Sequence, residues 1–186
     1  QTGLDYIRGG VRRRVTGQTS KDSHEKFMRA ALGYARKGLG KTSPNPAVGA
    51  VIVRKDQIIA GGFHRKAGAP HAEVEALNRL QGKARPGDTL YVTLEPCNHY
   101  GRTPPCTQAI LEKGVRKVVV GMKDPNPRVK GGGCEVLSRQ GVEVVTGVLE
   151  LECRRLNEWF VTYVTKRRPF VIAKTAMTTE PTTQTI

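Results

Sequence analysis

The chain has 186 residues, of which 38% are hydrophobic and 25% are charged, as is ordinary for one globular domain. This composition excludes collagen, a coiled coil and a fully disordered chain, and no apolar run approaches the roughly 18 residues that a membrane span needs. With 31 Lys and Arg against 16 Asp and Glu, the formal net charge is +15, which favours an anionic partner but says nothing about the fold.

The basic charge is concentrated near the amino terminus. Ten Lys and Arg and three Asp and Glu lie before position 42, so this part of the chain has a net charge of +7. The other basic residues are spread along the sequence without the aromatic residues that single-strand nucleic-acid binders place among their cations. The pattern is more typical of a solvated basic surface than of a nucleic-acid interface, so we do not expect nucleic acid as the partner.

The cysteine content and the start of the chain bear on its location. Four cysteines in 186 residues are too few for a disulfide-dense scaffold, and two of them stand in a pattern typical of metal ligands. The longest uncharged stretch near the start is too short for the apolar segment of a secretory signal. We therefore expect a reducing compartment, the cytoplasm.

The first part of the chain predicts an arm followed by a helix. Residues 1–20 are rich in Gly, Arg and Thr without any periodicity, and we expect them to form a disordered basic arm. After them, apolar residues at helical spacing predict a helix that Asp22 or Ser23 caps. Gly38 and Gly40 are expected to end it.

The rest of the chain predicts a sheet between helices. Two apolar runs around a charged turn predict a β-hairpin, with strands over 47–53 and 57–63. The elements expected after it are helices over 71–80, 107–113, 134–140 and 150–163, with strands over 89–94, 117–121 and 142–145 between them. A hairpin followed by alternating helices and strands indicates an α/β fold in which the later strands are parallel.

Potential metal ligands gather in two short segments. His71 begins a predicted helix, Cys97 follows a predicted strand, and Cys106 comes nine residues later, before another helix. One imidazole and two thiolates are three of the four ligands of a tetrahedral zinc, which leaves one position for water. The other two cysteines have no closely spaced partner. The sequence therefore favours an open, catalytic zinc site over a closed, structural one.

A carboxylate stands beside the first of these ligands. Glu73 lies two residues after His71, a spacing that turns it away from the ligand direction and into the cavity. There it can take a proton from water and return it to a nitrogen of the substrate. His-x-Glu with Pro-Cys and a later Cys is the pattern of zinc deaminases. Their usual Cys-x-x-Cys is absent, because eight residues separate Cys97 from Cys106.

Four segments carry a resemblance to a known family. They are Ser-Pro-Asn-Pro-Ala-Val-Gly (43–49), Gly-Ala-Pro-His-Ala-Glu (68–73), Thr-Leu-Glu-Pro-Cys-Asn-His-Tyr-Gly-Arg-Thr-Pro-Pro-Cys (93–106) and Asp-Pro-Asn-Pro (124–127). With them, the stretch from about Asp22 to Thr165 resembles the bacterial riboflavin-biosynthesis pyrimidine deaminases, the amino-terminal half of bifunctional deaminase/reductases. The long insert between the two cysteines distinguishes this family from cytidine and tRNA-adenosine deaminases. The resemblance implies a three-layer α/β/α cytidine deaminase-like fold with a central mixed sheet of about five strands.

The resemblance also implies roles for individual residues. His71, Cys97 and Cys106 match the ligands of Zn2+, and Glu73 matches the catalytic proton shuttle. The residues that match positions around the substrate pyrimidine and its ribose phosphate are Asn45, His64, His99, Arg102 and Thr103. Family members often have Lys where Arg102 stands, and either cation can meet a phosphate, although Arg does so bidentately.

One loop has two interpretations at this stage. Residues 124–133 match the family's loop beside the pocket. Turn chemistry alone is equally consistent with a Pro- and Asn-rich turn that contacts no ligand.

The implied reaction is the hydrolytic deamination of a diamino-hydroxypyrimidine ribosylamine phosphate to the aminouracil and ammonia, an early step of riboflavin biosynthesis. Zinc lowers the pKa of its water toward ~7, Glu73 takes the proton, and hydroxide attacks the ring carbon that bears the exocyclic amine. The expected partner is thus a phosphorylated pyrimidine ribosylamine, which a basic surface attracts. The resemblance also suggests a homo-oligomer.

The end of the chain departs from the full length of this family. Residues 167–177 look like the first strand of the reductase half, but about 200 residues are needed for a nucleotide-binding domain, and no Gly-rich fingerprint occurs. We therefore expect no reductase activity and no NADP site in these residues. The expected organisation is a basic arm over 1–20, a deaminase domain over 21–165 and a reductase remnant over 166–186.

Two other functions stay open on the sequence alone. The same zinc chemistry could act on a base in RNA or DNA, which predicts a steep salt dependence of oligonucleotide binding. Alternatively, the zinc is structural and the protein is a nucleic-acid-binding module. That function requires a fourth protein ligand to the metal.

Overall fold

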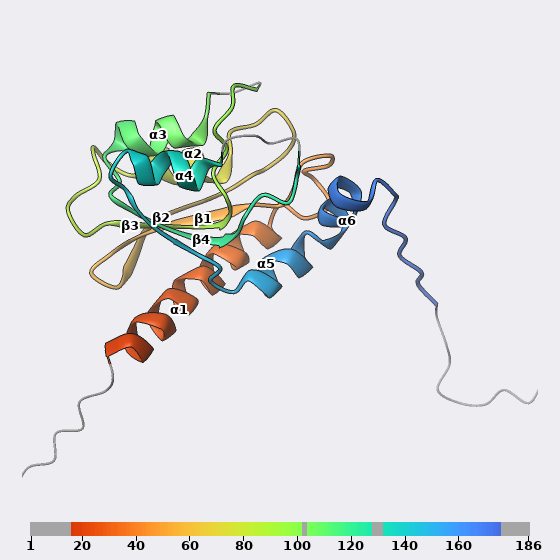
Figure 1. The fold of residues 1–186 in the computed structure, drawn as a ribbon, viewed down its shortest axis with the longest axis horizontal. Coiled ribbons are helices and arrows are strands. Elements are labelled where there is room, and N and C mark those ends of the chain that lie inside the picture. Colours follow the sequence, from red (N-terminus) through yellow and green to blue (C-terminus); the bar gives the residue numbers. More distant parts are fainter. Residues whose placement is uncertain (1–15, 102–103, 128–131, 176–186) are drawn as a thin grey trace, which may run out of the picture.

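A mixed five-stranded sheet with the order β2-β1-β3-β4-β5 lies at the centre of the molecule (Figure 1). This computed structural model describes residues 16–101, 104–127 and 132–175. The strands are β1 (Gly49–Arg54), β2 (Gln57–Phe63), β3 (Thr89–Leu94), β4 (Lys117–Met122) and β5 (Glu143–Thr146). The pairs of β1 with β2 and with β3 are antiparallel, whereas β3, β4 and β5 are parallel. The predicted hairpin and the parallel later strands are confirmed.

Helices cover both faces of the sheet. They are α1 (Thr16–Arg36), α2 (Ala72–Arg79), α3 (Cys106–Lys113), α4 (Gly133–Arg139), α5 (Glu150–Leu156) and α6 (Glu158–Lys166). Figure 1 shows α2, α3 and α4 on one face and α1 and α5 on the other, with α6 following α5. The expected three-layer α/β/α architecture is therefore confirmed. None of the helices in the described ranges is long and apolar enough to cross a bilayer.

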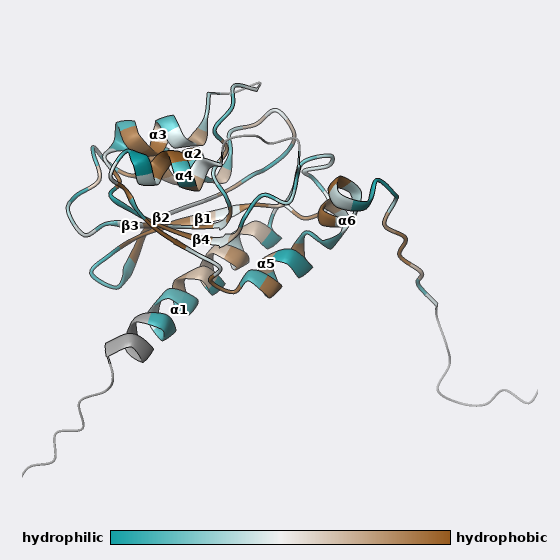
Figure 2. Ribbon diagram, viewed as in Figure 1, coloured by the Kyte–Doolittle hydropathy of each residue, from teal (hydrophilic) through white to brown (hydrophobic). Residues whose placement is uncertain are grey.

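Two hydrophobic cores lie on opposite faces of the sheet. Along β4, Val118 and Val120 belong to the core under α2, α3 and α4, whereas Val119 belongs to the core against α1 and α5. Because successive side chains of a strand point to opposite faces, a strand buried on both faces is a continuous apolar run. In Figure 2 the central strands carry many hydrophobic residues, whereas α1 and α5 carry both hydrophobic and hydrophilic residues.

The amino-terminal helix is longer than the sequence predicts. α1 begins at Thr16, so the expected cap at Asp22 or Ser23 is wrong, and residues 16–20 are helical rather than disordered. The physical reason is that extending a formed helix fixes one residue for each new hydrogen bond, whereas starting one fixes several residues for a single bond. The remainder of the expected arm, residues 1–15, lies outside the described residues.

The carboxyl-terminal helix is divided, contrary to the expectation of one helix over 150–163. α5 ends before Asn157 and α6 begins after it, and the backbone of Asn157 has φ −115° and ψ 28°. Its buried side chain bonds both polar backbone atoms of Ala47, which lies 110 residues earlier in the chain. A helical pattern in the sequence cannot reveal such a distant partner. After α6, residues 167–175 form neither helix nor strand.

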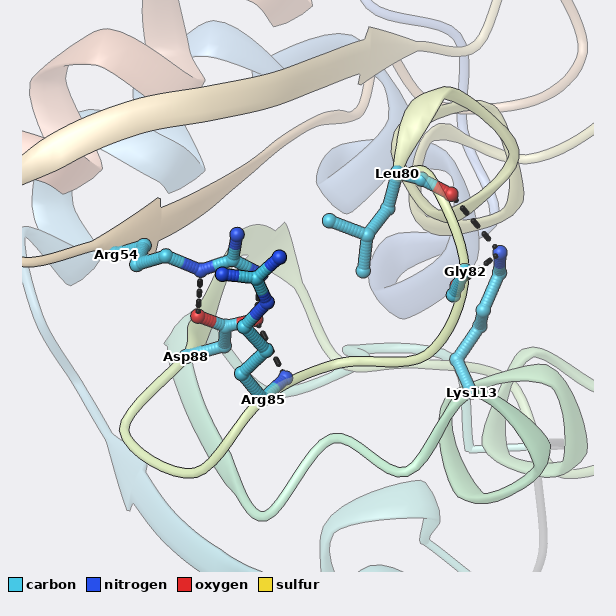
Figure 3. Close-up of polar contacts among 6 residues, drawn as sticks. All are labelled: Arg54, Leu80, Gly82, Arg85, Asp88 and Lys113. Atoms are coloured by element: carbon cyan, nitrogen blue, oxygen red, sulfur yellow. Dashed lines mark hydrogen bonds and ion pairs between the residues drawn. The ribbon is translucent and has the colours of Figure 1, made fainter.

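An ion pair joins two strands at the end of the sheet where β1 ends and β3 begins. Arg54 donates from Nε and Nη2 to the two carboxylate oxygens of Asp88, each at 2.7 Å (Figure 3). The amide of Arg85 donates to the same carboxylate at 2.8 Å. The Asp88 side chain is fully buried, and the hydrogen bonds from Arg54 lower the pKa of this carboxyl below its usual range.

A lysine closes the loop between α2 and β3, and Figure 3 shows its contacts with the backbone. Lys113, at the end of α3, donates from Nζ to the carbonyl oxygens of Leu80 at 3.1 Å and Gly82 at 2.9 Å. These bonds tie the end of α3 to the segment that leads from α2 to β3. We therefore assign the ion pair and the hydrogen bonds of Lys113 a role in the stability of the fold.

We expect Asp88→Ala to lower the free energy of unfolding by about 2–3 kcal/mol near neutral pH, as measured by urea denaturation. The change removes a bidentate ion pair and leaves the Arg85 amide without its acceptor. Since the pKa of Asp88 is lowered in the folded state, its contribution is present above the unfolded value of about 3.9. The contribution is lost as the pH falls through the lower folded value, so the two proteins should converge in acid.

The control is Glu143→Ala, which breaks an ion pair with Lys117 in which the Glu143 side chain is 61% exposed. Such a surface pair contributes under about 1 kcal/mol. Equal losses in the two variants would contradict the role assigned to Asp88.

Candidate active site

Three potential metal ligands from three parts of the fold meet near the carboxyl end of β3. His71 directly precedes α2, Cys97 follows β3, and Cys106 is the first residue of α3. His71 Nδ1 lies 3.2 Å from Cys106 Sγ and 3.5 Å from Cys97 Sγ. The three donor atoms all lie within 4.8 Å of one another. The structure thus brings the three predicted ligands together.

The starts of two helices position this donor group. His71 has an extended backbone, with φ −71° and ψ 162°, so the chain turns into α2 directly after it. The amide of Cys106 donates to Cys97 Sγ at 3.4 Å. The Cys106 thiol and His71 also donate to this sulfur and lower the pKa of Cys97, while the hydrogen bond to Cys97 and burial raise the pKa of Cys106. The start of α3 favours a thiolate at Cys97, because the free N–H groups and the dipole of the helix stabilise negative charge.

The donor set fits a tetrahedral zinc. Zn–N distances of about 2.0–2.1 Å and Zn–S distances of about 2.3 Å place the nitrogen and sulfur ligands about 3.6 Å apart. The observed nitrogen–sulfur distances of 3.2 and 3.5 Å are close to that value. In the part of the chain that the structure describes, the group has three members. Such a group could hold a metal ion with one position open.

Glu73 lies in the first turn of α2 and lines the same cavity as His71. Although its side chain carries a carboxyl group, Glu73 is only 3% exposed. Burial is the main cause that raises the pKa of Glu73 to about 7, and its neighbours His71 and Cys97 act in opposite directions. A carboxyl group with such a pKa can both accept and donate a proton near neutral pH.

The donor group opens into a cavity of about 470 Å³. Three of the predicted substrate-binding residues, Asn45, His64 and His99, line it. The other two, Arg102 and Thr103, lie outside the described residues.

Hydrogen bonds fix the side chains of Asn45 and His64. His64 Nδ1 donates a hydrogen bond to the carbonyl oxygen of Pro70 at 3.1 Å. His64 Nε2 is then an acceptor, and Asn45 Nδ2 donates to it at 3.1 Å. Burial lowers the pKa of His64 and so favours the neutral ring. Its ring also meets that of His71 edge-on, with the centroids 5.4 Å apart.

Several further residues line the cavity without having been predicted individually, and four of them bear on its chemistry and shape. These four are Glu95, Asp124, Asn126 and Phe160. Asp124 and Asn126 belong to the loop for which two interpretations were open, and they place its start beside the cavity. The position of Glu95 directly before Pro-Cys is the feature of the sequence that could have indicated it. Phe160 belongs to a helical pattern of apolar residues, which is typical of a core position and does not indicate a cavity.

Glu95 connects three parts of the site. Its Oε2 accepts a hydrogen bond from the amide of Asp124 at 3.1 Å, and its Oε1 accepts one from the amide of Cys134 at 3.0 Å. The amide of Asn126 in turn donates to Asp124 Oδ1 at 2.8 Å. One carboxylate therefore holds both ends of the segment between β4 and α4 beside Cys97.

Comparison with known proteins identifies the family. The family model described as the cytidine and deoxycytidylate deaminase zinc-binding region matches residues 21–122. This chain belongs to that deaminase family. The riboflavin biosynthesis protein RibD of Aquifex aeolicus is 52% identical over 85% of this chain and 44% of its own length. The RibD of Synechocystis is 54% identical over 84% of this chain and 42% of its own length.

Solved structures of such deaminases have the same fold. A deaminase/reductase of Thermotoga maritima is 52% identical, with a TM-score of 0.77 over 81% of this chain and 44% of that one. The Rib2 deaminase of Aspergillus oryzae in complex with DARIPP is 25% identical, with a TM-score of 0.59 over 78% of this chain. The predicted resemblance is thus confirmed. The chain spans less than half the length of the RibD proteins and of the Thermotoga protein.

We expect Glu95→Ala to accelerate hydrogen exchange at the amides of Asp124 and Cys134 by at least about tenfold. Each amide loses a hydrogen bond to a charged acceptor, which contributes about 1.5–3 kcal/mol. Exchange followed by mass spectrometry or NMR measures the change.

The matched control is Glu135→Ala, in the first turn of α4, which removes an ion pair with the exposed Lys123. Unchanged exchange in Glu95→Ala, or equal acceleration in both variants, would show that Glu95 does not anchor this segment.

Proposed function

We propose that this chain is a zinc-dependent deaminase that acts on a diaminohydroxy-phosphoribosylaminopyrimidine in riboflavin biosynthesis. The observation that carries the proposal is the buried Glu73, which lines one cavity with His71 and Cys97, two members of the donor group that Cys106 completes. The names of the RibD relatives and of the Thermotoga deaminase/reductase support this substrate. The product is the corresponding aminouracil, and the nitrogen leaves as ammonia.

His71, Cys97 and Cys106 would hold the zinc ion. When bound, zinc supplies a Lewis acid that activates water at neutral pH. Glu73 accepts a proton from the attacking water and delivers it to the amine nitrogen as the bond from nitrogen to the ring carbon breaks. The oxygen of the water stays on the ring carbon as the new carbonyl group, and the second proton of the water passes to the adjacent ring nitrogen. Burial of Glu73 keeps this proton away from bulk solvent.

Asn45, His64 and His99 would bind the pyrimidine. Because Asn45 Nδ2 donates to His64, the amide is oriented with its oxygen available to an amino group of the substrate. Arg102 and Thr103 are proposed to meet the phosphate, on the strength of the family resemblance. The net charge of +15 raises the local concentration of such an anionic substrate.

The alternative of a structural zinc needs a fourth protein ligand. In the described ranges the donor group has three members, and it opens into a cavity lined by Glu73. Both features support a catalytic site.

We expect the purified protein to contain about one zinc per chain, as measured by elemental analysis, and Cys97→Ser to lose most of it. A thiolate is replaced by a hydroxyl that does not ionise at neutral pH, so the remaining two ligands bind weakly. Cys134→Ser is the control, because this buried cysteine lies outside the donor group, and it should retain the metal. Full zinc content in Cys97→Ser would refute the ligand assignment.

We expect Glu73→Gln to reduce ammonia release from the ribosylamine phosphate by at least about 100-fold while zinc content stays unchanged. The amide is nearly isosteric with the carboxyl group but cannot carry the proton, and general acid–base catalysis contributes about 100- to 10,000-fold. Glu112→Gln, on the exposed side of α3, should keep the full rate.

Two outcomes would contradict the proposal in different ways. A zinc-loaded Glu73→Gln protein with the unmodified rate would refute the proton shuttle. An unmodified protein that releases no ammonia from the ribosylamine phosphate, but deaminates oligonucleotides with a steep salt dependence, would support the nucleic-acid alternative instead.

A further inference from the structure

The helices α5 and α6 lie beyond residues 21–122, the part that matches the deaminase family model, yet α6 reaches the cavity. Phe160 of α6 lines it, and Asn157 bonds to the segment that carries Asn45. We propose that Asn157 is a positioning residue that holds the Asn45 segment in its substrate-binding shape, and that Phe160 completes the same wall. The inference rests on the proposed function.

Asn157 makes a two-point contact with the backbone. Its Oδ1 accepts a hydrogen bond from the amide of Ala47 at 2.8 Å, and its Nδ2 donates to the carbonyl oxygen of Ala47 at 2.9 Å. Asn157 is only 1% exposed, and Ala47 is fully buried. Because both bonds are shielded from water, losing them leaves buried polar groups without partners, which costs more than losing exposed ones.

The segment before β1 transmits this contact to Asn45. Pro46 stands between Asn45 and Ala47, and its ring fixes φ at this position, which limits how far Ala47 can shift without moving Asn45. The amide of Asn45 donates to the carbonyl oxygen of Thr42 at 2.8 Å, and its side chain donates to His64. Asn157 therefore supplies the anchor on the far side of Pro46.

The same residue sets the course of α6. The backbone of Asn157 ends α5 and starts α6, and its carbonyl oxygen accepts the amide of Val161 at 2.9 Å. Phe160 follows three residues after Asn157 and lines the same cavity as Asn45 and Pro46. Phe160 is 9% exposed and lines the cavity. Asn157 thus bonds to the segment next to Asn45, while Phe160 of the helix that starts after it lines the cavity.

The test compares kinetics on the ribosylamine phosphate with zinc content and amide exchange. We expect Asn157→Ala to raise KM about tenfold, the equivalent of about 1.4 kcal/mol or one buried hydrogen bond, while kcat changes less than about threefold. Zinc should stay at about one per chain, since its ligands lie elsewhere. Hydrogen exchange at the Ala47 amide should accelerate by at least about tenfold.

Two further variants keep the test decisive if Asn157→Ala folds poorly. Asn157→Asp keeps the acceptor for the Ala47 amide but loses the donor to its carbonyl oxygen, and it should also raise KM. Phe160→Leu changes the cavity wall alone and should raise KM without changing exchange at Ala47. Asn78→Ala is the control, because this exposed asparagine of α2 does not line the cavity, and it should leave every quantity unchanged.

The possible failures are distinguishable. A merely structural role would reduce the folded fraction, so Asn157→Ala would lower kcat per chain and leave KM unchanged, which would overturn the inference. Unchanged exchange at Ala47 would also overturn it. If the unmodified protein does not deaminate the ribosylamine phosphate, the proposed function fails. In that event, exchange at Ala47 still decides whether Asn157 holds this segment.

Discussion

The close approach of one imidazole nitrogen to two sulfur atoms, at 3.2 and 3.5 Å, is the constraint on which the rest of the site depends. It requires the first residues of α2 and α3 to lie next to each other, and both helices pack on the same face of the sheet. The strand β3, buried along its whole length, ends beside them and delivers Cys97. Because Glu73 is in the first turn of α2, the same geometry buries this carboxyl group next to the donor atoms.

Around this group, hydrogen bonds from side chains to backbone atoms hold the cavity wall. Glu95 accepts bonds from the amides at both ends of the segment between β4 and α4, His64 donates to Pro70, and Asn157 binds both polar atoms of Ala47. Within the described residues, no buried side-chain nitrogen or oxygen lacks a hydrogen-bond partner. A site supported in this way keeps its shape before substrate arrives, which reduces the cost of binding.

Much of the fold and of the site was predictable from the sequence, because the deciding signals are local. The residues of β3 were predicted in full, since an apolar run between turn residues is sufficient to indicate a buried strand. His71, Cys97 and Cys106 were identified through residue types and short spacings, and the structure places them together. In contrast, neither the start of α1 at Thr16 nor the break at Asn157 has a local signal, and both were predicted wrongly.

The sequence by itself determined the element types and the α/β class and indicated the candidate donor residues, because periodicity and ligand spacing depend on neighbours along the chain. Only the tertiary structure decided which remote residues complete the cavity. Phe160 reads as an ordinary core residue of a helix until α6 is placed beside the cavity. Asn157 contacts Ala47 across 110 residues, and contacts at such a separation depend on how the helices pack on the sheet, which no local pattern encodes.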